Sequence, residues 1–433
     1  MEREELAAWL RLTLTPGVGN ATARRLLAAF GLPTSLFAQP ASTLAQVVGP
    51  TQAASLRTAP PELAQLVETT WQWLHAQGDE PGQADGAGHR SILVLGDAGY
   101  PESLLNIADP PLMLYLLGAG AASIHESNTT FSHVGIKEFA TNSIVNSLQD
   151  CTAQSVAIVG SRNPTPQGLD NARQFARALS QAGFAIVSGM ALGVDGAAHV
   201  GALEGFDAPD AQKNNRPQRL ATIAVVGTGL DRVYPKSHRT LAHAIAQNGL
   251  IISEYPLGTP PLAANFPKRN RLIAALAQGT LVVEAALKSG SLITARLAAE
   301  QGKEVFVIPG SIHSAQSRGC HALIREGAKL VESAEDVLED LKIDKAPVLI
   351  ASKPYRTWEK VEIDVPSRAD DAAQPAEADG LLTALGFDPV SLDALQARTG
   401  IDTAHLQAQL MALELQGLIA RLPGGLFQRM VQA

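Results

Sequence analysis

Small residues follow several short apolar runs in the middle of the chain, in a pattern suited to binding an anion. Gly160, Ser161 and Arg162 close the run at 156–160, and comparable turns follow the runs at 184–188 and 281–285, contributing Ser188, Gly189, Gly193, Ser289 and Gly290. Small residues at a helix N-terminus leave backbone N–H groups accessible, and the helix dipole favours negative charge there. One such turn would mean little, because tight strand-to-helix turns need glycine for geometry alone. Their recurrence predicts a phosphate-binding shelf.

A second candidate is the segment 265–271, which carries Phe266, Lys268, Arg269 and Arg271. Arginine can fork onto phosphate oxygens, and an aromatic ring can stack on a base, although a core position suits Phe266 better than a stacking role. Residues 211–272 hold nine Lys and Arg against two acids, in a chain whose net charge is −8. This local excess of positive charge is typical of a surface that binds a polyanion. The alternative is a capped, solvated helix start, with the other charges spread over several faces.

The elements that would position these residues are short apolar strands alternating with amphipathic helices. The predicted strands are 92–97, 111–118, 156–160, 184–188, 222–227, 250–254, 281–285 and 304–309. Strands that are apolar on both faces indicate a parallel sheet covered by helices on each side. We predict an α/β fold with a doubly wound, mostly parallel, extended Rossmann-like sheet. Ligands of such sheets bind beyond the carboxyl ends of the strands, where the turns meet.

Other regions suggest further domains. Residues 1–76 have helical periodicity, with a turn at 15–20 that resembles a helix-hairpin-helix, so we predict a helical SAM-like domain. The Rossmann-like domain is placed at 85–340, with polar insertions at 119–154 and 207–218. Residues 341–378 are rich in Pro, Ala and acids and predict a linker, whereas 379–433 predict a winged helix from three helical stretches and a hairpin.

Several classes of protein are disfavoured. No G-x-G-x-x-G motif with a following acid and no P-loop motif accompanies a strand, and no Cys and His cluster has metal-ligand spacing, so we expect neither cofactor nor metal. The two cysteines, Cys151 and Cys320, fit a reducing compartment. The N-terminus lacks the features of a secretory signal, and no apolar run is long enough for a membrane helix. We therefore expect a cytoplasmic protein without membrane association.

The motifs resemble one family as a series. VAIVGSRNPTPQG (156–168), SGMALGVDGAAHVGAL (188–203), GTGLDRVYPKSHRTL (227–241) and NFPKRNRLIAAL (265–276) look like those of the DNA-processing protein A (DprA/Smf) family in order, spacing and identity. The resemblance implies single-stranded DNA binding, protection of incoming strands in natural transformation, loading of RecA recombinase, and a homodimer built through the Rossmann-like domain. It also implies phosphate contacts by Gly160, Ser161 and Arg162, a pocket lined by Ser188, Gly189 and Gly193, and a backbone grip by Lys268, Arg269 and Arg271.

Two other readings stay open. The first is an enzyme, a Rossmann-like nucleotide phosphoribohydrolase with Glu284 as its acid, although the Pro-Gly-Gly-x-Gly-Thr run of that class is absent. The second is an adaptor that binds recombinase but no DNA. The winged-helix segment is acidic, which favours an interaction role over strong duplex binding. On balance we expect a single-stranded DNA-binding protein that is not an enzyme.

Overall fold

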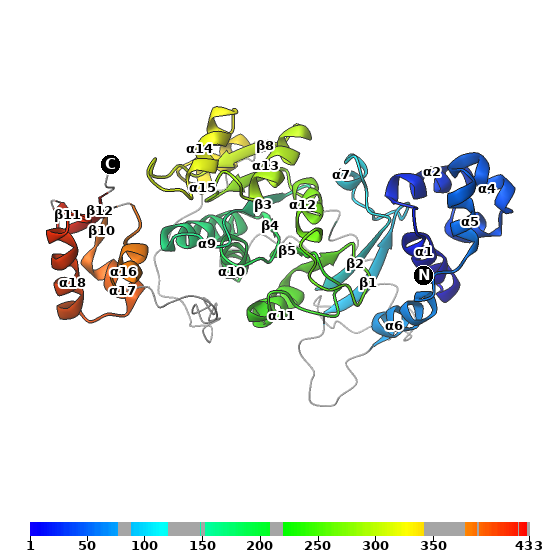
Figure 1. The fold of residues 1–433 in the computed structure, drawn as a ribbon, viewed down its shortest axis with the longest axis horizontal. Coiled ribbons are helices and arrows are strands. Elements are labelled where there is room, and N and C mark those ends of the chain that lie inside the picture. Colours follow the sequence, from blue (N-terminus) through cyan, green and yellow to red (C-terminus); the bar gives the residue numbers. More distant parts are fainter. Residues whose placement is uncertain are drawn as a thin grey trace, which may run out of the picture. The chain divides into compact units, whose positions relative to one another are not determined.

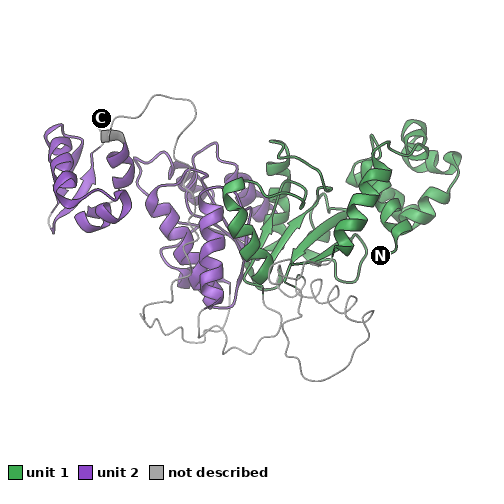
Figure 2. Cartoon of the chain, turned by 90° about the horizontal axis from the view of Figure 1, so that it is seen from below, with its two compact units in different colours: residues 1–155, 214–277 green, residues 156–213, 278–433 purple. Residues whose placement is uncertain are grey.

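The computed structural model describes residues 1–76, 88–119, 148, 152–207, 220–341, 377–387, 389–422 and 424–430. The chain separates into two compact units, coloured separately in Figure 2. Unit 1 contains residues 1–155 and 214–277, and unit 2 contains residues 156–213 and 278–433. The predicted insertions at 119–154 and 207–218 and the linker at 341–378 fall almost wholly outside the described residues. The predicted domain boundaries stay a prediction.

Unit 1 begins with six helices. They are α1 (Arg3–Leu14), α2 (Asn20–Phe30), α3 (Pro33–Ala38), α4 (Ala41–Val48), α5 (Pro50–Arg57) and α6 (Leu63–His75). The sequence predicts only the first, second and sixth, because α3 to α5 are too short to show a clear helical period. Leucines from these helices and Trp9 form one apolar cluster with Val94 and Tyr115 of the following strands. The helical segment therefore shares its core with part of the sheet.

The sheet strands of unit 1 have the order β1-β2-β6-β5. They are β1 (His89–Val94), β2 (Met113–Gly118), β5 (Thr222–Val225) and β6 (Leu250–Ser253). β5 and β6 are parallel, whereas β2 runs antiparallel to both of its neighbours. The helical elements of this part are α7 (Glu102–Leu105), the 3-10 turn η2 (Lys236–His238), α11 (Arg239–Asn248) and α12 (Asn265–Leu276).

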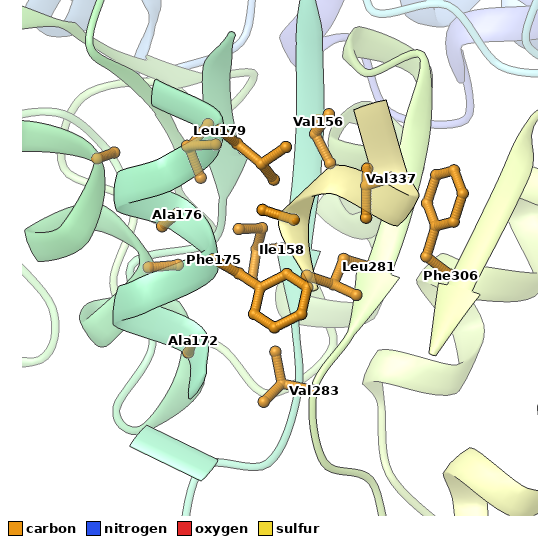
Figure 3. Close-up of a cluster of buried hydrophobic side chains, with 14 of the residues drawn as sticks. Val156, Ile158, Ala172, Phe175, Ala176, Leu179, Leu281, Val283, Phe306 and Val337 are labelled. Atoms are coloured by element: carbon orange, nitrogen blue, oxygen red, sulfur yellow. The ribbon is translucent and has the colours of Figure 1, made fainter. Parts of the chain in front are cut away.

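Unit 2 carries strands in the order β4-β3-β7-β8-β9. They are β3 (Ser155–Val159), β4 (Ala185–Ser188), β7 (Gly279–Val282), β8 (Glu304–Val307) and β9 (Lys329–Leu330), and the pairings of β3 with β7, β7 with β8 and β8 with β9 are parallel. Helices α9 (Pro166–Gln181), α13 (Ser291–Glu300) and α14 (Arg318–Arg325) connect successive strands, whereas α10 (Val194–Phe206) follows β4 and α15 (Ala334–Asp340) follows β9 (Figure 1). Phe175 and Leu179 of α9 belong to one buried apolar cluster with Ile158, Leu281 and Phe306 of the strands (Figure 3).

The C-terminal segment folds around its own apolar core. It contains α16 (Glu377–Leu385), β10 (Val390–Ser391), α17 (Leu392–Thr399), α18 (Thr403–Leu415), β11 (Ile419–Leu422) and β12 (Leu426–Arg429). The strands have the order β10-β12-β11, with β11 and β12 as an antiparallel hairpin. This is the predicted winged helix, and the predicted mostly parallel α/β sheet is likewise confirmed.

Candidate functional site

Three strand-end turns of unit 2 are tied together by backbone hydrogen bonds. Ser161, directly after β3, donates its N–H to the carbonyl of Glu284 after β7 at 2.7 Å. Its own carbonyl accepts from the N–H of Val194, the first residue of α10, at 3.1 Å. The turns after β3, β4 and β7 therefore form one connected surface. The predicted residues Gly160, Ser161, Arg162, Gly193 and Gly290 all belong to these turns, as do Ser188, Gly189 and Ser289.

The fold itself requires two of the glycines. A Cβ at Gly193, whose φ is +79°, would lie 2.5 Å from the carbonyl oxygen of Ser161 and 2.7 Å from that of Arg162. A Cβ at Gly160 would lie 2.7 Å from a methyl carbon of Val194. Gly290 is different, because no atom lies within 4 Å of the position that a Cβ would take. Gly290 thus has no packing reason to be glycine.

The side chains of these turns divide into internal and exposed groups. Ser188 is fully buried and donates its hydroxyl to the carbonyl of Ile158 at 2.6 Å. The hydroxyl of Ser161, also buried, accepts from the N–H of Asn163 at 3.1 Å, and Ser289 Oγ lies 2.7 Å from Ser291 Oγ. Gly189 is buried, whereas Arg162 is exposed. Arg162 is therefore the charged member of the predicted site residues of unit 2, and it is an exposed residue.

Glu284, the acid of the enzyme reading, holds the start of α9. Its carboxylate accepts the Thr165 N–H at 2.9 Å and the Thr165 hydroxyl at 2.5 Å. The same hydroxyl accepts from the N–H of Gly168 at 3.0 Å and so caps α9. A Cβ at Gly168 would overlap the carboxylate. This arrangement assigns Glu284 a positioning role that its place at a strand end does not reveal.

In unit 1, the cations of α12 have three different environments. Lys268 is exposed. Arg269 is only 4% exposed, and its guanidinium donates to the carbonyl of Val225 and, at 3.0 Å, to Asn270 Oδ1. Arg269 could therefore contact a DNA backbone, as the family resemblance implies, only with its side chain in a different arrangement. The helical pattern contains the signal for this burial, because Arg269 precedes the buried Leu272 and Ile273 by three and four residues, on the same face of α12.

Arg271 is held by an ion pair. Its two terminal nitrogens donate to the carboxylate oxygens of Glu254 at 2.9 and 2.6 Å, and its Nε donates to the carbonyl of Asp109 at 3.1 Å. Asp109 in turn accepts from Asn20 of α2 at 3.1 Å. Local sequence could not predict these partners, since Asp109 is 162 positions away from Arg271. A pocket of about 400 Å³ opens here, lined by Asn20, Asp109, Tyr255, Lys268, Arg271 and neighbours.

The turn after β5 adds further exposed cations to unit 1. Arg232, Lys236 and Arg239 are exposed, whereas Lys213, Arg216 and Arg219 of the same predicted basic stretch lie outside the described residues. Burial alone would raise the pKa of Asp231, but hydrogen bonds from Arg232 and the Gly258 N–H hold that pKa below its ordinary value. Asp231 therefore stays ionised, and its carboxylate is bound by Arg232 and the Gly258 N–H.

The described residues hold no group of three or more His, Cys, Asp and Glu able to bind a metal ion. None of their helices is long and apolar enough to cross a bilayer.

Comparison with known proteins agrees with these motifs. Residues 144–342 match the family described as DNA recombination-mediator protein A, and residues 365–425 match the DprA winged helix domain. Protein Smf of Synechocystis is 34% identical over 78% of this chain and 80% of its own length. The chain belongs to the DprA/Smf family. The DNA processing protein DprA of Streptococcus pneumoniae is 46% identical over 58% of this chain and 74% of its own length.

The fold agrees with a solved family member. The X-ray structure of DNA processing protein A from Streptococcus pneumoniae superimposes with a TM-score of 0.58 at 30% identity, over 79% of this chain and 99% of that chain. The predicted family and fold are thereby confirmed. The individual site residues stay predictions, because none of these comparisons assigns a role to a residue.

Proposed function

We propose that the chain is a sequence-independent single-stranded DNA-binding protein of natural transformation and recombination, and that it is not an enzyme. The observation that carries the proposal is the connected surface of unit 2, in which the turns after β3, β4 and β7 present the exposed Arg162. Backbone N–H groups at helix starts and a guanidinium suit phosphates and do not read bases. The names of the relatives, which describe DNA processing, support a nucleic-acid ligand.

The exposed cations of unit 1 support the same ligand. Lys268, Lys236 and Arg239 are exposed and available to phosphates, whereas Arg269 and Arg271 are engaged inside the protein. We therefore assign phosphate contacts to Arg162 and Lys268 first, with Gly160, Gly193, Ser289 and Gly290 shaping the backbone surface. Ser161, Ser188 and Gly189 act behind that surface, and Arg269 and Arg271 hold elements of unit 1 together.

The enzyme alternative is weaker. Glu284 would have to act as a general acid, yet both of its carboxylate oxygens accept hydrogen bonds from Thr165. A carboxylate whose two oxygens are both engaged in this way is committed to positioning α9.

The family resemblance extends the proposal to partners. We propose RecA recombinase as a partner that the protein loads onto DNA, and a homodimer through the Rossmann-like domain. We do not assign duplex binding to the winged helix, because α18 contains no Lys or Arg. Sedimentation velocity and a RecA strand-exchange assay test these two partners.

The central experiment is fluorescence polarisation of labelled poly-dT and of a duplex across a salt series. We expect preference for the single strand and an affinity that falls with salt, with a log–log slope of about −0.7 per phosphate neutralised. Arg162→Ala and Lys268→Ala should each flatten the slope and weaken all sequences alike. A salt-independent affinity, or release of base from nucleoside monophosphates, contradicts the proposal.

A further inference from the structure

An aromatic pair lies beside the basic turn of unit 1. Tyr234, in the turn after β5, keeps 43% of its surface exposed, and its ring centroid lies 5.5 Å from that of Phe266 at the start of α12. The two rings are inclined by 39°. Phe266 itself lies over the turn, since a Cβ at Gly227 would be 3.3 Å from its ring. Phe266 therefore supports the Tyr234 ring from one side while the other part of that ring faces solvent.

The turn that carries Tyr234 is fixed on several sides. The N–H of Gly229 donates to the carbonyl of Thr259 at 3.1 Å, and Ser253 Oγ donates to the carbonyl of Thr228 at 2.6 Å. Asp231 accepts from the N–H of Gly258 at 2.8 Å. A large ring that is exposed on a fixed turn is already ordered before a ligand arrives, which lowers the entropy cost of binding.

The charges around this ring suit a nucleic-acid strand. Arg232 and Lys236 flank Tyr234 two positions away on each side, and both are exposed. Asp231, the acid of this turn, accepts hydrogen bonds from the Arg232 guanidinium at 2.8 Å and from the Gly258 N–H. Cations beside an aromatic face are the arrangement that binds single strands without sequence preference, because every base has a face that can stack.

We propose that Tyr234, backed by Phe266, is a base-stacking platform for the single strand. This inference rests on the proposed function and adds a contact to the bases. Phosphate contacts alone would not distinguish a strand with bases from one without them. Stacking predicts that removal of the bases lowers affinity, and that this loss depends on the ring at position 234.

The experiment compares binding of poly-dT with binding of an abasic strand of equal length and charge, at one salt concentration. The wild-type protein should bind poly-dT roughly tenfold more tightly than the abasic strand. Tyr234→Ala and Tyr234→Leu should lose this preference while keeping abasic affinity, and Tyr234→Phe should retain it. Tyr234→Leu keeps apolar bulk against Phe266, so it remains informative if the alanine variant folds poorly. Leu32→Ala, which removes apolar surface that is 54% exposed on the helical segment, is the control and should change neither affinity.

Each outcome decides between the two proposals. If the wild type binds both strands equally, single-strand binding stands and the stacking platform is wrong. The platform is also wrong if Tyr234→Leu keeps the preference or weakens both strands to the same extent. If the wild type binds neither strand, the proposed function falls together with this inference.

Discussion

The guanidinium of Arg271 faces the carboxylate of Glu254 end-on through its two terminal nitrogens, with nitrogen–oxygen distances of 2.9 and 2.6 Å. The two side chains are only 15% and 12% exposed. The pair connects the middle of α12 to the residue that follows β6, and the Arg271 Nε–Asp109 bond extends the link toward α2. Arg271, which the sequence motif predicts to contact the ligand, thus holds elements of unit 1 together.

Arg271→Ala should therefore reduce stability more than DNA affinity. Removing one partner of a largely buried ion pair leaves the other charge uncompensated, at a cost of about 3 kcal/mol. Arg271→Lys should recover part of this loss, because lysine keeps the charge but not the planar fork. Thermal unfolding and the salt slope for poly-dT are the two measurements. If Arg271→Ala leaves unfolding unchanged and flattens the slope, Arg271 is a phosphate contact after all.

The two glycines Gly193 and Gly290 should respond differently to alanine. Gly290→Ala meets open space at a φ of −63°, so the melting temperature should stay unchanged. The same variant should weaken poly-dT binding roughly tenfold if a phosphate approaches the backbone there. Unchanged affinity of a folded Gly290→Ala protein would remove this turn from the binding surface.

Gly193→Ala supplies the contrasting case. Its Cβ would overlap two carbonyl oxygens of the neighbouring turn, at a sparsely populated backbone conformation that costs an L-residue roughly 1–3 kcal/mol before any overlap. We expect a lower melting temperature together with weaker binding. A Gly193→Ala protein of wild-type stability would contradict the packing seen between these turns.

Ser188→Ala separates a structural serine from a ligand contact. The hydroxyl is fully buried and satisfies the Ile158 carbonyl, so its loss should cost about 1 kcal/mol of stability. The affinity of the folded variant for poly-dT should equal that of the wild type. A selective loss of affinity at unchanged stability would show that the hydroxyl reaches the ligand.

The sheet could be predicted from sequence because its strands are short and buried. Such strands appear as continuous apolar runs, and the prediction at 304–309 contains β8 at Glu304–Val307. β7 begins two residues earlier than predicted, since Gly279 and Thr280 are buried but not apolar. Short periodic signals therefore locate strands well and their ends less well.

The site was predictable in position but not in the role of each side chain. Glycine-containing turns at strand ends follow from topology, and these turns do meet in unit 2. Which side chains face outward depends on distant partners, such as the Val225 carbonyl for Arg269 and Thr165 for Glu284. Such contacts join residues that are 44 and 119 positions apart, so no local pattern encodes them.

Lys303 gives a prediction for pH. Burial lowers its pKa from the ordinary 10.5 to about 8, because a partly buried ammonium loses hydration. The unfolded chain therefore binds more protons than the folded one between pH 8 and 10.5, so this residue makes stability rise with pH across that window. Below pH 8 the cost of burying the charge is fully present.

Lys303→Met should consequently raise the melting temperature at neutral pH, and its advantage should shrink and disappear as pH approaches 10.5. Differential scanning calorimetry of both proteins across this range makes the comparison, with the exposed Lys288→Met as the control whose difference should not vary in this way. A Lys303→Met protein that is less stable at neutral pH would show that the ammonium group is a favourable partner in the fold.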